Sequence, residues 1–352
     1  MALDPRQTIK KSYKMGGYIM KTAFARTTHR LGLAGVSLVA LTGLSLSAQA
    51  QQTITVGHAI SDDSHYSVGV DAFAEKLAEL SDGAFTVDEQ PSGALGGERD
   101  MIEGLQIGTL DAVINSTGPL GNFVPETYVL DLPFLFRDYD HARCVLDGEI
   151  GQNLLDKVGE NDLVGLAWTE NGFRHMTNNQ REIHTPEDAA GLKVRTMENE
   201  MHMAAFEEID VQPTPMAFPE LFTALQQGTV DGQENPISVI LTSNMWEVQD
   251  HLSLTGHVYS PAIMLASPVL WDGLSEEERG WFIEAAQAGA EATRSMVSRL
   301  ETEGVEELKE KGMTVVEDVD TSVFQEAVEP SYSVYTDEHG SEMLNRIRNS
   351  DC

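Results

Sequence analysis

The stretch Gly191–Pro236, GLKVRTMENEMHMAAFEEIDVQPTPMAFPELFTALQQGTVDGQENP, decides the fold. Apolar and polar residues alternate over 192–197, which predicts a strand with Arg195 on one face. The residues 200–208 are expected to form a helix, and a short strand follows. A second helix and a last strand complete the stretch, so helices and strands alternate as in an α/β sheet.

The end of this stretch carries polar side chains. Its second helix is expected to start near Pro219, a residue tolerated in a first turn, and to end at Gly228. Thr229–Val230 should begin the last strand, and 233–236 should form a turn rich in amide and acidic groups. Ligands of α/β sheets bind beyond strand ends, so this turn is a candidate wall of a binding site.

The N-terminal part of the chain has the same alternating order, which predicts a mostly parallel sheet. The glycine-rich loop 92–97 lacks the G-x-G-x-x-G order and the P-loop lysine, so nucleotide binding is not expected there. The expected elements are strands at 53–58, 84–90 and 111–114, and helices at 64–80 and 98–106.

One joint occurs twice. Leu105–Ala112, LQIGTLDA, matches Leu225–Gly232, LQQGTVDG, almost residue for residue. Coincidence is one explanation, because joints from helix through glycine to strand favour these residue types. Extended without gaps, however, the match places Asn115 opposite Asn235, each just past a strand end. Two similar α/β lobes with facing amides predict a ligand cleft between them.

Three segments are expected to connect the lobes. A buried strand at 163–168 leads to an extended crossing segment at 174–178, and a strand at 258–267 returns to the first lobe. A capping box at Ser275 then opens a helical pattern that continues almost to Lys311. About 35 helical residues span about 50 Å, which is enough to run across both lobes.

The N-terminus resembles an export signal. A basic start near Met20 precedes an apolar run at 31–46 and the residues Ala48-Gln49-Ala50, which predicts cleavage after Ala50. A membrane anchor is the alternative, but the run is short for a bilayer span and rich in Gly and Ser. We therefore expect a soluble protein in the periplasm, with residues 1–50 outside the fold.

The chain is acidic, with a net charge of -33. Residues 1–50 hold seven of the 23 basic and one of the 56 acidic residues, so the remainder carries 16 against 55, or -39. Nucleic acid is not expected as a partner, because phosphate contacts need clustered cations. The two cysteines allow a bridge between Cys144, on a helix expected over 139–158, and Cys352. Alternatively, Cys144 is a small core residue and Cys352 is free.

Signatures of catalysis are missing. The sequence has no G-x-S-x-G or H-E-x-x-H motif, no cysteine beside a plausible base, and no histidines at metal-ligand spacing. We expect a binding protein without enzymatic activity, metal or cofactor.

Two arginines are the informative cations of the second lobe. Arg174 and Arg195 fall at strand or crossing positions near Asn235 and Phe218. Either could form a salt bridge to one of many acids. A guanidinium also matches a carboxylate bidentately, which gives orientation as well as attraction. Phe218 would then cover the ligand or act as a hydrophobic staple of its helix.

These motifs resemble a known family. NGFRHMTN at 171–178, PTPMAF at 213–218 and ELFTALQQGTVDGQENP at 220–236 are similar to the periplasmic solute-binding subunit of tripartite ATP-independent periplasmic (TRAP) transporters, the DctP family. The resemblance covers the mature chain. It implies an α/β two-lobed periplasmic binding protein fold, with a long helix bridging both lobes, a cleft between them, hinged closure and delivery to a membrane permease.

The resemblance also implies roles for single residues. The family arginine that grips a carboxylate falls on Arg195, its amide partner on Asn235, the covering aromatic on Phe218, and a second arginine on Arg174. In sialic-acid-binding relatives a glutamate occupies the first-lobe strand end, where this chain has Asn115-Ser116, which argues against sialic acid. From the first lobe we expect these further ligand-binding residues: Asn115, Ser116, His58, Trp168 and Asn171.

The many hydroxyl and amide groups favour a sugar acid such as a hexuronate. A C4-dicarboxylate is the alternative, because Arg174 could hold a second acid group, and a periplasmic ligand-sensing module is the alternative class. The expected partners are this organic acid and the permease subunits, with the protein a monomer. Lobe I should comprise 51–172 plus about 261–300, and lobe II 173–260 plus about 301–352.

Overall fold

The structure is a computed structural model that describes residues 51–352. The predicted signal peptide lies outside these residues. Among the described helices, none combines the length and the apolar character that crossing a membrane requires.

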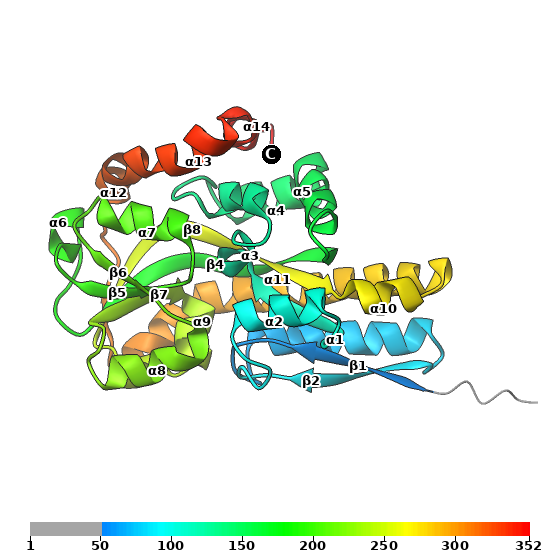
Figure 1. The fold of residues 1–352 in the computed structure, drawn as a ribbon. Coiled ribbons are helices and arrows are strands. Elements are labelled where there is room, and N and C mark those ends of the chain that lie inside the picture. Colours follow the sequence, from blue (N-terminus) through cyan, green and yellow to red (C-terminus); the bar gives the residue numbers. More distant parts are fainter. Residues whose placement is uncertain (1–50) are drawn as a thin grey trace, which may run out of the picture. The chain divides into compact units, whose positions relative to one another are not determined.

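A central mixed sheet runs through the molecule in the order β2-β1-β3-β8-β4-β7-β5-β6, with β9 paired to β8 (Figure 1). At the two ends of the sheet the strands are parallel, β2-β1-β3 at one end and β7-β5-β6 at the other. In the middle, β8 is antiparallel to β3 and β4, and β4 is antiparallel to β7. The strands are β1 (Gln52–Gly57), β2 (Phe85–Gln90), β3 (Ala112–Ser116), β4 (Val164–Asn178), β5 (Lys193–Thr196), β6 (Gln212–Pro215), β7 (Gly232–Pro236), β8 (His251–Ala266) and β9 (Thr314–Val316).

The two halves of this sheet are built alike, and each forms one lobe. In lobe I the order is β1-α1-β2-α2-β3-α3, and in lobe II it is β5-α7-β6-α8-β7-α9. The expected alternation of strands and helices is therefore confirmed in both lobes. The helices are α1 (His65–Leu80), α2 (Glu98–Gln106), α3 (Thr117–Leu120), α7 (Glu200–Glu207), α8 (Phe218–Gln226) and α9 (Ile237–Thr242).

The repeated joint has the same structure in both lobes. The Asp111 carboxylate accepts a hydrogen bond from the Thr55 N–H at 2.9 Å, and the Asp231 carboxylate accepts one from the Lys193 N–H at 2.9 Å. In each lobe this aspartate ties the strand after the joint to the first strand of the lobe. The correspondence read from the sequence is therefore a structural repeat.

The strand boundaries at this joint were predicted too early. The N–H groups of Thr109 and Thr229 bond back to the Gly104 and Ala224 carbonyls at 2.9 Å, so the chain is still completing the helix end there. Consequently β7 starts at Gly232, and the residues 233–236 are strand rather than turn. Asn115 and Asn235 likewise lie within strands, each as the fourth residue of its strand.

The long strands β4 and β8 connect the lobes. The segments 163–168 and 174–178, expected separately, belong to the single strand β4, and β8 begins seven residues before the expected Val258. The β4–β8 register shifts between Glu170 and Gly172, where Gly172 has a φ of 122° that favours glycine. The predicted lobe boundary at 172/173 falls at this bulge.

Helix α11 (Glu276–Glu310) has the predicted capping box and the predicted length of 35 residues. Its Phe282 belongs to a core cluster with α1 and β1 of lobe I. Further along, Leu300 and Leu308 belong to a core cluster with α8 and α9 of lobe II. The helix therefore bridges both lobes, as expected.

Short helices cover the remaining surfaces. The single helix expected over 139–158 is wrong, because Gly148 is extended and separates two helices.

The bridge between Cys144 and Cys352 is formed, which joins the C-terminus to α4. The elements are η1 (Pro125–Asp131), α4 (Tyr139–Asp147), α5 (Glu149–Gly159), α6 (Pro186–Ala189), η2 (Met245–Glu247), α10 (Pro268–Gly273), α12 (Thr321–Val328), η3 (Glu329–Ser331), α13 (Tyr332–His339) and α14 (Glu342–Arg348).

Candidate functional site

A cavity of about 300 Å³ lies between the lobes, where β3, β5, β7 and the first turns of α2 and α8 meet. Most of its lining residues are buried, so the cavity is largely shielded from solvent. Five of the nine predicted site residues line it: Arg195, Asn235, Phe218, Ser116 and Asn171. The other lining residues are Ala59, Ile60, Tyr66, Glu98, Met197 and Val239.

Arg195 is the cationic side chain of this cavity. Its Nε and Nη2 donate to the Met216 carbonyl oxygen at 2.9 and 2.7 Å, which fixes the plane of the guanidinium. Its Nη1 is buried and has no partner among the described residues. Burial lowers the pKa of Arg195 to about 10, so it remains a cation at neutral pH. The end of the guanidinium that carries Nη1 and Nη2 is thus available to an anion.

Phe218 is the first residue of α8, and its ring lies 5.9 Å from the Arg195 guanidinium carbon. This distance is within the range of a cation–π contact. The ring also packs against the core clusters of both lobes. Phe218 therefore both covers the cavity and packs at its helix start, and the two roles weighed from the sequence are compatible.

Glu98 enters the cavity from the first residue of α2. Its Oε1 accepts from the Ser116 N–H at 2.6 Å and its Oε2 accepts from the Ser116 hydroxyl at 3.0 Å. Burial raises the pKa of Glu98, whereas these hydrogen bonds and the charge of Arg195 act in the opposite direction. Because both donors point at the carboxylate, they favour its ionised form.

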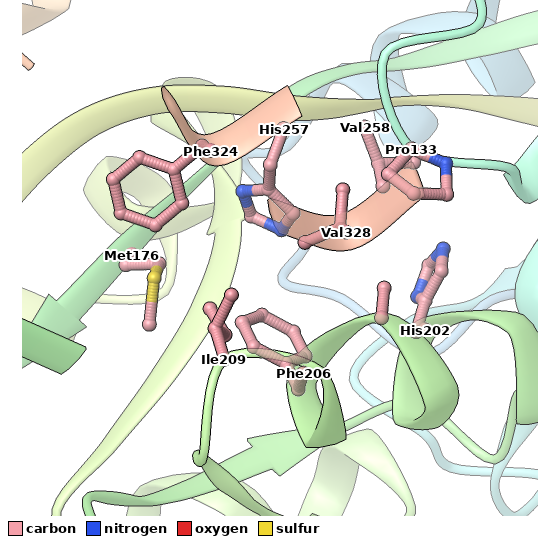
Figure 2. A pocket seen from close by; sticks show the side chains of 10 residues that line it. Pro133, Met176, His202, Phe206, Ile209, His257, Val258, Phe324 and Val328 are labelled. Carbon is pink, nitrogen blue, oxygen red and sulfur yellow. The ribbon is translucent and has the colours of Figure 1, made fainter. Parts of the chain in front are cut away.

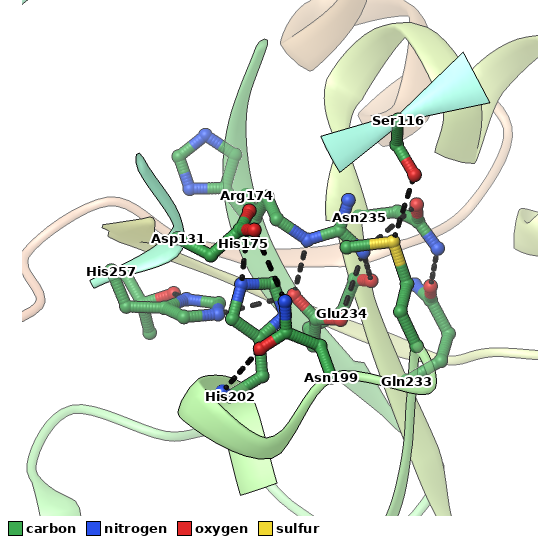
Figure 3. A network of polar contacts seen from close by, with 12 residues as sticks. Ser116, Asp131, Arg174, His175, Asn199, His202, Gln233, Glu234, Asn235 and His257 are labelled. Carbon is green, nitrogen blue, oxygen red and sulfur yellow. Dashed lines mark hydrogen bonds and ion pairs between the residues drawn. The ribbon is translucent and has the colours of Figure 1, made fainter. Parts of the chain in front are cut away.

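Arg174 does not line the cavity but belongs to a buried network that includes Asn235 of the lining (Figure 3). Its Nε and Nη2 bind the Glu234 carboxylate, with Nη2 2.8 Å from Oε1, and Nη2 also donates to the Asn235 Oδ1 at 3.1 Å. Burial would raise the pKa of Glu234, but Arg174 and the hydrogen bond from His257 hold it well below its usual range. The charge of Arg174 is therefore already compensated.

Three other predicted site residues also lie outside the cavity lining. Asn115 donates from Nδ2 to the Glu98 backbone carbonyl at 2.9 Å, so it supports the start of α2. His58 is buried and bonds through Nε2 to Glu89 at 2.8 Å. Trp168 donates from Nε1 to the Gly151 carbonyl at 2.9 Å and lines a groove beside α11.

Sequence reasoning missed Glu98, Tyr66 and Met197. Tyr66 is a buried residue of α1, and its hydroxyl has no partner among the described residues. The Met197 sulfur lies 3.2 Å from the Ser116 hydroxyl oxygen, and this contact links the two lobes. The sequence did contain a signal for Glu98. If the repeat that pairs Leu105 with Leu225 is extended back to the helix starts, Glu98 corresponds to Phe218, which was a predicted site residue.

Polar contacts join the lobes around the cavity. Asn199 of lobe II donates from Nδ2 to the Gly118 carbonyl at 3.0 Å and to the Asp131 carboxylate at 3.1 Å, both in lobe I. Across the cleft, the Asn122 Nδ2 donates to the Glu198 carbonyl at 2.7 Å. These three hydrogen bonds tie lobe II directly to lobe I.

A second cavity, of about 340 Å³, has a different character (Figure 2). Apolar side chains from α7 and α12, among them Phe206 and Phe324, form most of its walls together with His202 and His257. Burial lowers the pKa of His202 to about 3, so this imidazole is neutral. A carboxylate would find no cationic partner in these walls, so the cavity that contains Arg195 is the better candidate site.

Residues 56–338 match the family described as DctP, bacterial extracellular solute-binding protein, family 7. The chain belongs to this family. Members of the DctP family are substrate-binding subunits of TRAP transporters and not enzymes, and they bind small organic acids and work with membrane permeases.

Several similar proteins match this chain over most of its length. A solute-binding protein of Verminephrobacter eiseniae is 46% identical over 304 residues, 86% of this chain and 91% of that protein. The crystal structure of a TRAP periplasmic solute-binding protein from Polaromonas sp. JS666, bound to D-erythronate, is 54% identical with a TM-score of 0.85, and covers 86% of this chain and 100% of that one. A Bordetella structure with density assigned to pantoate is 50% identical, with a TM-score of 0.84 and coverage of 86% and 100%.

The match extends to the architecture. These relatives are two-lobed binding proteins, and the present chain has the same two lobes on one mixed sheet. Within the described residues no three metal-binding side chains cluster.

Proposed function

We propose that this protein captures a hydroxylated organic acid, such as a hexuronate or a shorter sugar acid, in the periplasm and delivers it to a TRAP permease. The observation that carries the proposal is Arg195. Its guanidinium is held by the Met216 carbonyl, which leaves Nη1 and the second hydrogen of Nη2 to a ligand in a largely buried cavity. A carboxylate that binds this end gains two charge-assisted hydrogen bonds away from water.

The polar groups around Arg195 suit a ligand with several hydroxyls. Tyr66 offers a hydroxyl, Asn171 and Asn235 offer amide hydrogens, and Glu98 offers acceptor oxygens. Solved relatives support this ligand class, since they hold D-erythronate at 54% identity, galactonate at 37% and glucuronate at 32%.

A C4-dicarboxylate is the second candidate ligand. A relative from Sulfurospirillum deleyianum, 31% identical, was solved with succinate, and a C4-dicarboxylate-binding protein of Bacillus subtilis is 30% identical. The sequence left open that Arg174 could hold the second acid group of such a ligand. Its pairing with Glu234 argues against that role in the closed protein.

The partners follow from the same proposal. The signal peptide would place the chain in the periplasm, and the closed form, a monomer, would dock on the permease without nucleic acid. A sensing module would use the same pocket with another partner. Uptake of the bound acid by vesicles that contain the permease would distinguish transport from sensing.

A thermal-shift screen tests the ligand class. Hexuronates, aldonates, short hydroxy acids and C4-dicarboxylates are each added to the mature protein, and hits are measured by calorimetry. The proposal predicts stabilisation by hydroxylated monocarboxylates, with one acid bound per chain. Stabilisation only by neutral sugars or amino acids would contradict it.

A further inference from the structure

The cavity has two charged ends. Arg195 from lobe II and Glu98 from lobe I both line it, and each is fixed by hydrogen bonds to its own surroundings. Each Glu98 oxygen accepts one hydrogen bond from Ser116. A carboxylate oxygen can accept more than one, so both oxygens can still accept a hydrogen bond from a ligand. Ser116 is itself 1% exposed, so its donors are shielded from water and hold the carboxylate in place.

The charges around the cavity determine which ligand groups can lie next to Glu98. Arg195 is the only cationic side chain among the eleven described residues that line the cavity, and Arg174, outside the lining, is paired with Glu234. A monocarboxylate neutralises Arg195. A second ligand carboxylate would then approach Glu98 with no cation to compensate it. Two carboxylates in one largely buried site cannot both stay ionised without a large cost.

Hydroxyl groups, in contrast, suit this end. A hydroxyl donates to a carboxylate in a short, charge-assisted hydrogen bond without adding charge. Tyr66 stands in the same lining, and its buried hydroxyl lacks a partner among the described residues, so it can bond a second oxygen of the same ligand. An aldonate, which has one carboxylate, ends in a CH2OH group that can donate such a hydrogen bond. The matching aldarate has a second carboxylate in place of this CH2OH group.

We propose that Glu98 determines specificity at this site: it accepts hydrogen bonds from ligand hydroxyls and excludes ligands that carry a second carboxylate. The inference rests on the proposed function, because it takes Arg195 as the partner of the first carboxylate. It goes beyond that function in choosing between the two candidate ligand classes. The residue acts through direct contact with the ligand, so its effect differs between ligands rather than weakening all of them alike.

The test uses pairs of acids that differ only at one end. D-Erythronate is compared with meso-tartrate, and D-galactonate with galactarate, by calorimetry on the mature protein and on Glu98→Gln. Glutamine preserves the shape and one acceptor oxygen for the Ser116 N–H, and its amide NH2 can donate to the Ser116 hydroxyl oxygen, but the charge is removed. Glu103→Gln, at an exposed position of the same helix, is the matched control. The unfolding midpoint of each variant shows that it is folded.

We expect the wild-type protein to bind the monoacid of a pair at least about 100-fold more tightly than the diacid. In Glu98→Gln this ratio should fall at least tenfold, because the diacid gains affinity, while Glu103→Gln leaves it unchanged. An unchanged ratio in Glu98→Gln, with acids still bound, overturns the inference alone. Absence of binding by any acid overturns the proposed function and the inference together.

If Glu98→Gln does not fold, Ser116→Ala serves as the second variant. It removes the hydroxyl that holds Oε2 but keeps the backbone donor and the charge of Glu98. We then expect weaker binding of the monoacid and continued exclusion of the diacid. Equal binding of the two acids by Ser116→Ala would contradict the inference.

Discussion

Glu98 and Phe218 occupy equivalent positions in the two lobes and line the same cavity. Each is the first residue of a nine-residue helix, α2 or α8, that leads into the repeated joint. The helix starts lie close together, since a Cβ atom on Gly97 would be 3.1 Å from that of Ala217. The two related helix starts therefore meet at the cavity, one with a carboxylate and the other with an aromatic ring.

The buried pair of Arg174 and Glu234 should be essential for stability. Removing one partner of a buried ion pair leaves an uncompensated charge, which costs about 3–5 kcal/mol. We therefore expect Glu234→Ala to lower the free energy of unfolding in urea by that amount. Glu160→Ala, which breaks the exposed pair with Lys157, should change it far less, because water screens that pair. Equal effects of the two substitutions would refute this role.

Asp131 should make stability depend on pH. Burial raises its pKa to about 7, against the hydrogen bonds from Thr117 and Asn199. Between about pH 4 and pH 7 the folded protein therefore binds more protons at this residue than the unfolded chain does. Its contribution to the free energy of unfolding then falls as pH rises through this window, by at most about 1.4 kcal/mol per pH unit.

Asp131→Asn should remove that contribution. The measurement is the free energy of unfolding of the wild-type protein and the variant from pH 4 to pH 8. We expect the advantage of the wild-type protein over the variant to shrink as pH rises to 7. Asp337→Asn, at an exposed position of α13, is the control. A difference that stays constant with pH would show that Asp131 does not titrate in this window.

The bridge between Cys144 and Cys352 should stabilise the fold from its C-terminus. It closes a loop across a sequence separation of 208 residues, and a disulfide stabilises typically by about 2–4 kcal/mol. Reduction of the wild-type protein should therefore lower its unfolding midpoint to that of Cys352→Ser. The variant itself should not respond to reductant. A wild-type midpoint that stays unchanged after complete reduction would contradict this expectation.

The sequence predicted the frame of the fold well. Alternation and helix caps marked the order of strands and helices around Arg195, and the repeated joint at Leu105 and Leu225 revealed two related lobes. The capping box at Ser275 predicted the start of the 35-residue helix. These signals are local, so they can be recognised without knowing which helices and strands pack against one another.

Contacts between distant residues could not be read in this way. Arg174 and Arg195 have similar surroundings in the sequence, yet Glu234 pairs with the first, and the Met216 carbonyl holds the second. In a chain with 56 acidic residues nothing local marks Glu234 or Glu98 as special. The cysteine bridge was equally open, because it depends on where α14 packs.

The most direct test of the account is the affinity of Arg195→Ala for the acid that the wild-type protein binds best, measured by calorimetry. Truncating one partner of a buried charged hydrogen bond costs about 2–5 kcal/mol, so the dissociation constant should rise about 30-fold or more. Arg299→Ala, at an exposed position of α11, is the control and should leave it unchanged. Binding by Arg195→Ala that matches the wild type would contradict the claim that Arg195 holds the ligand carboxylate.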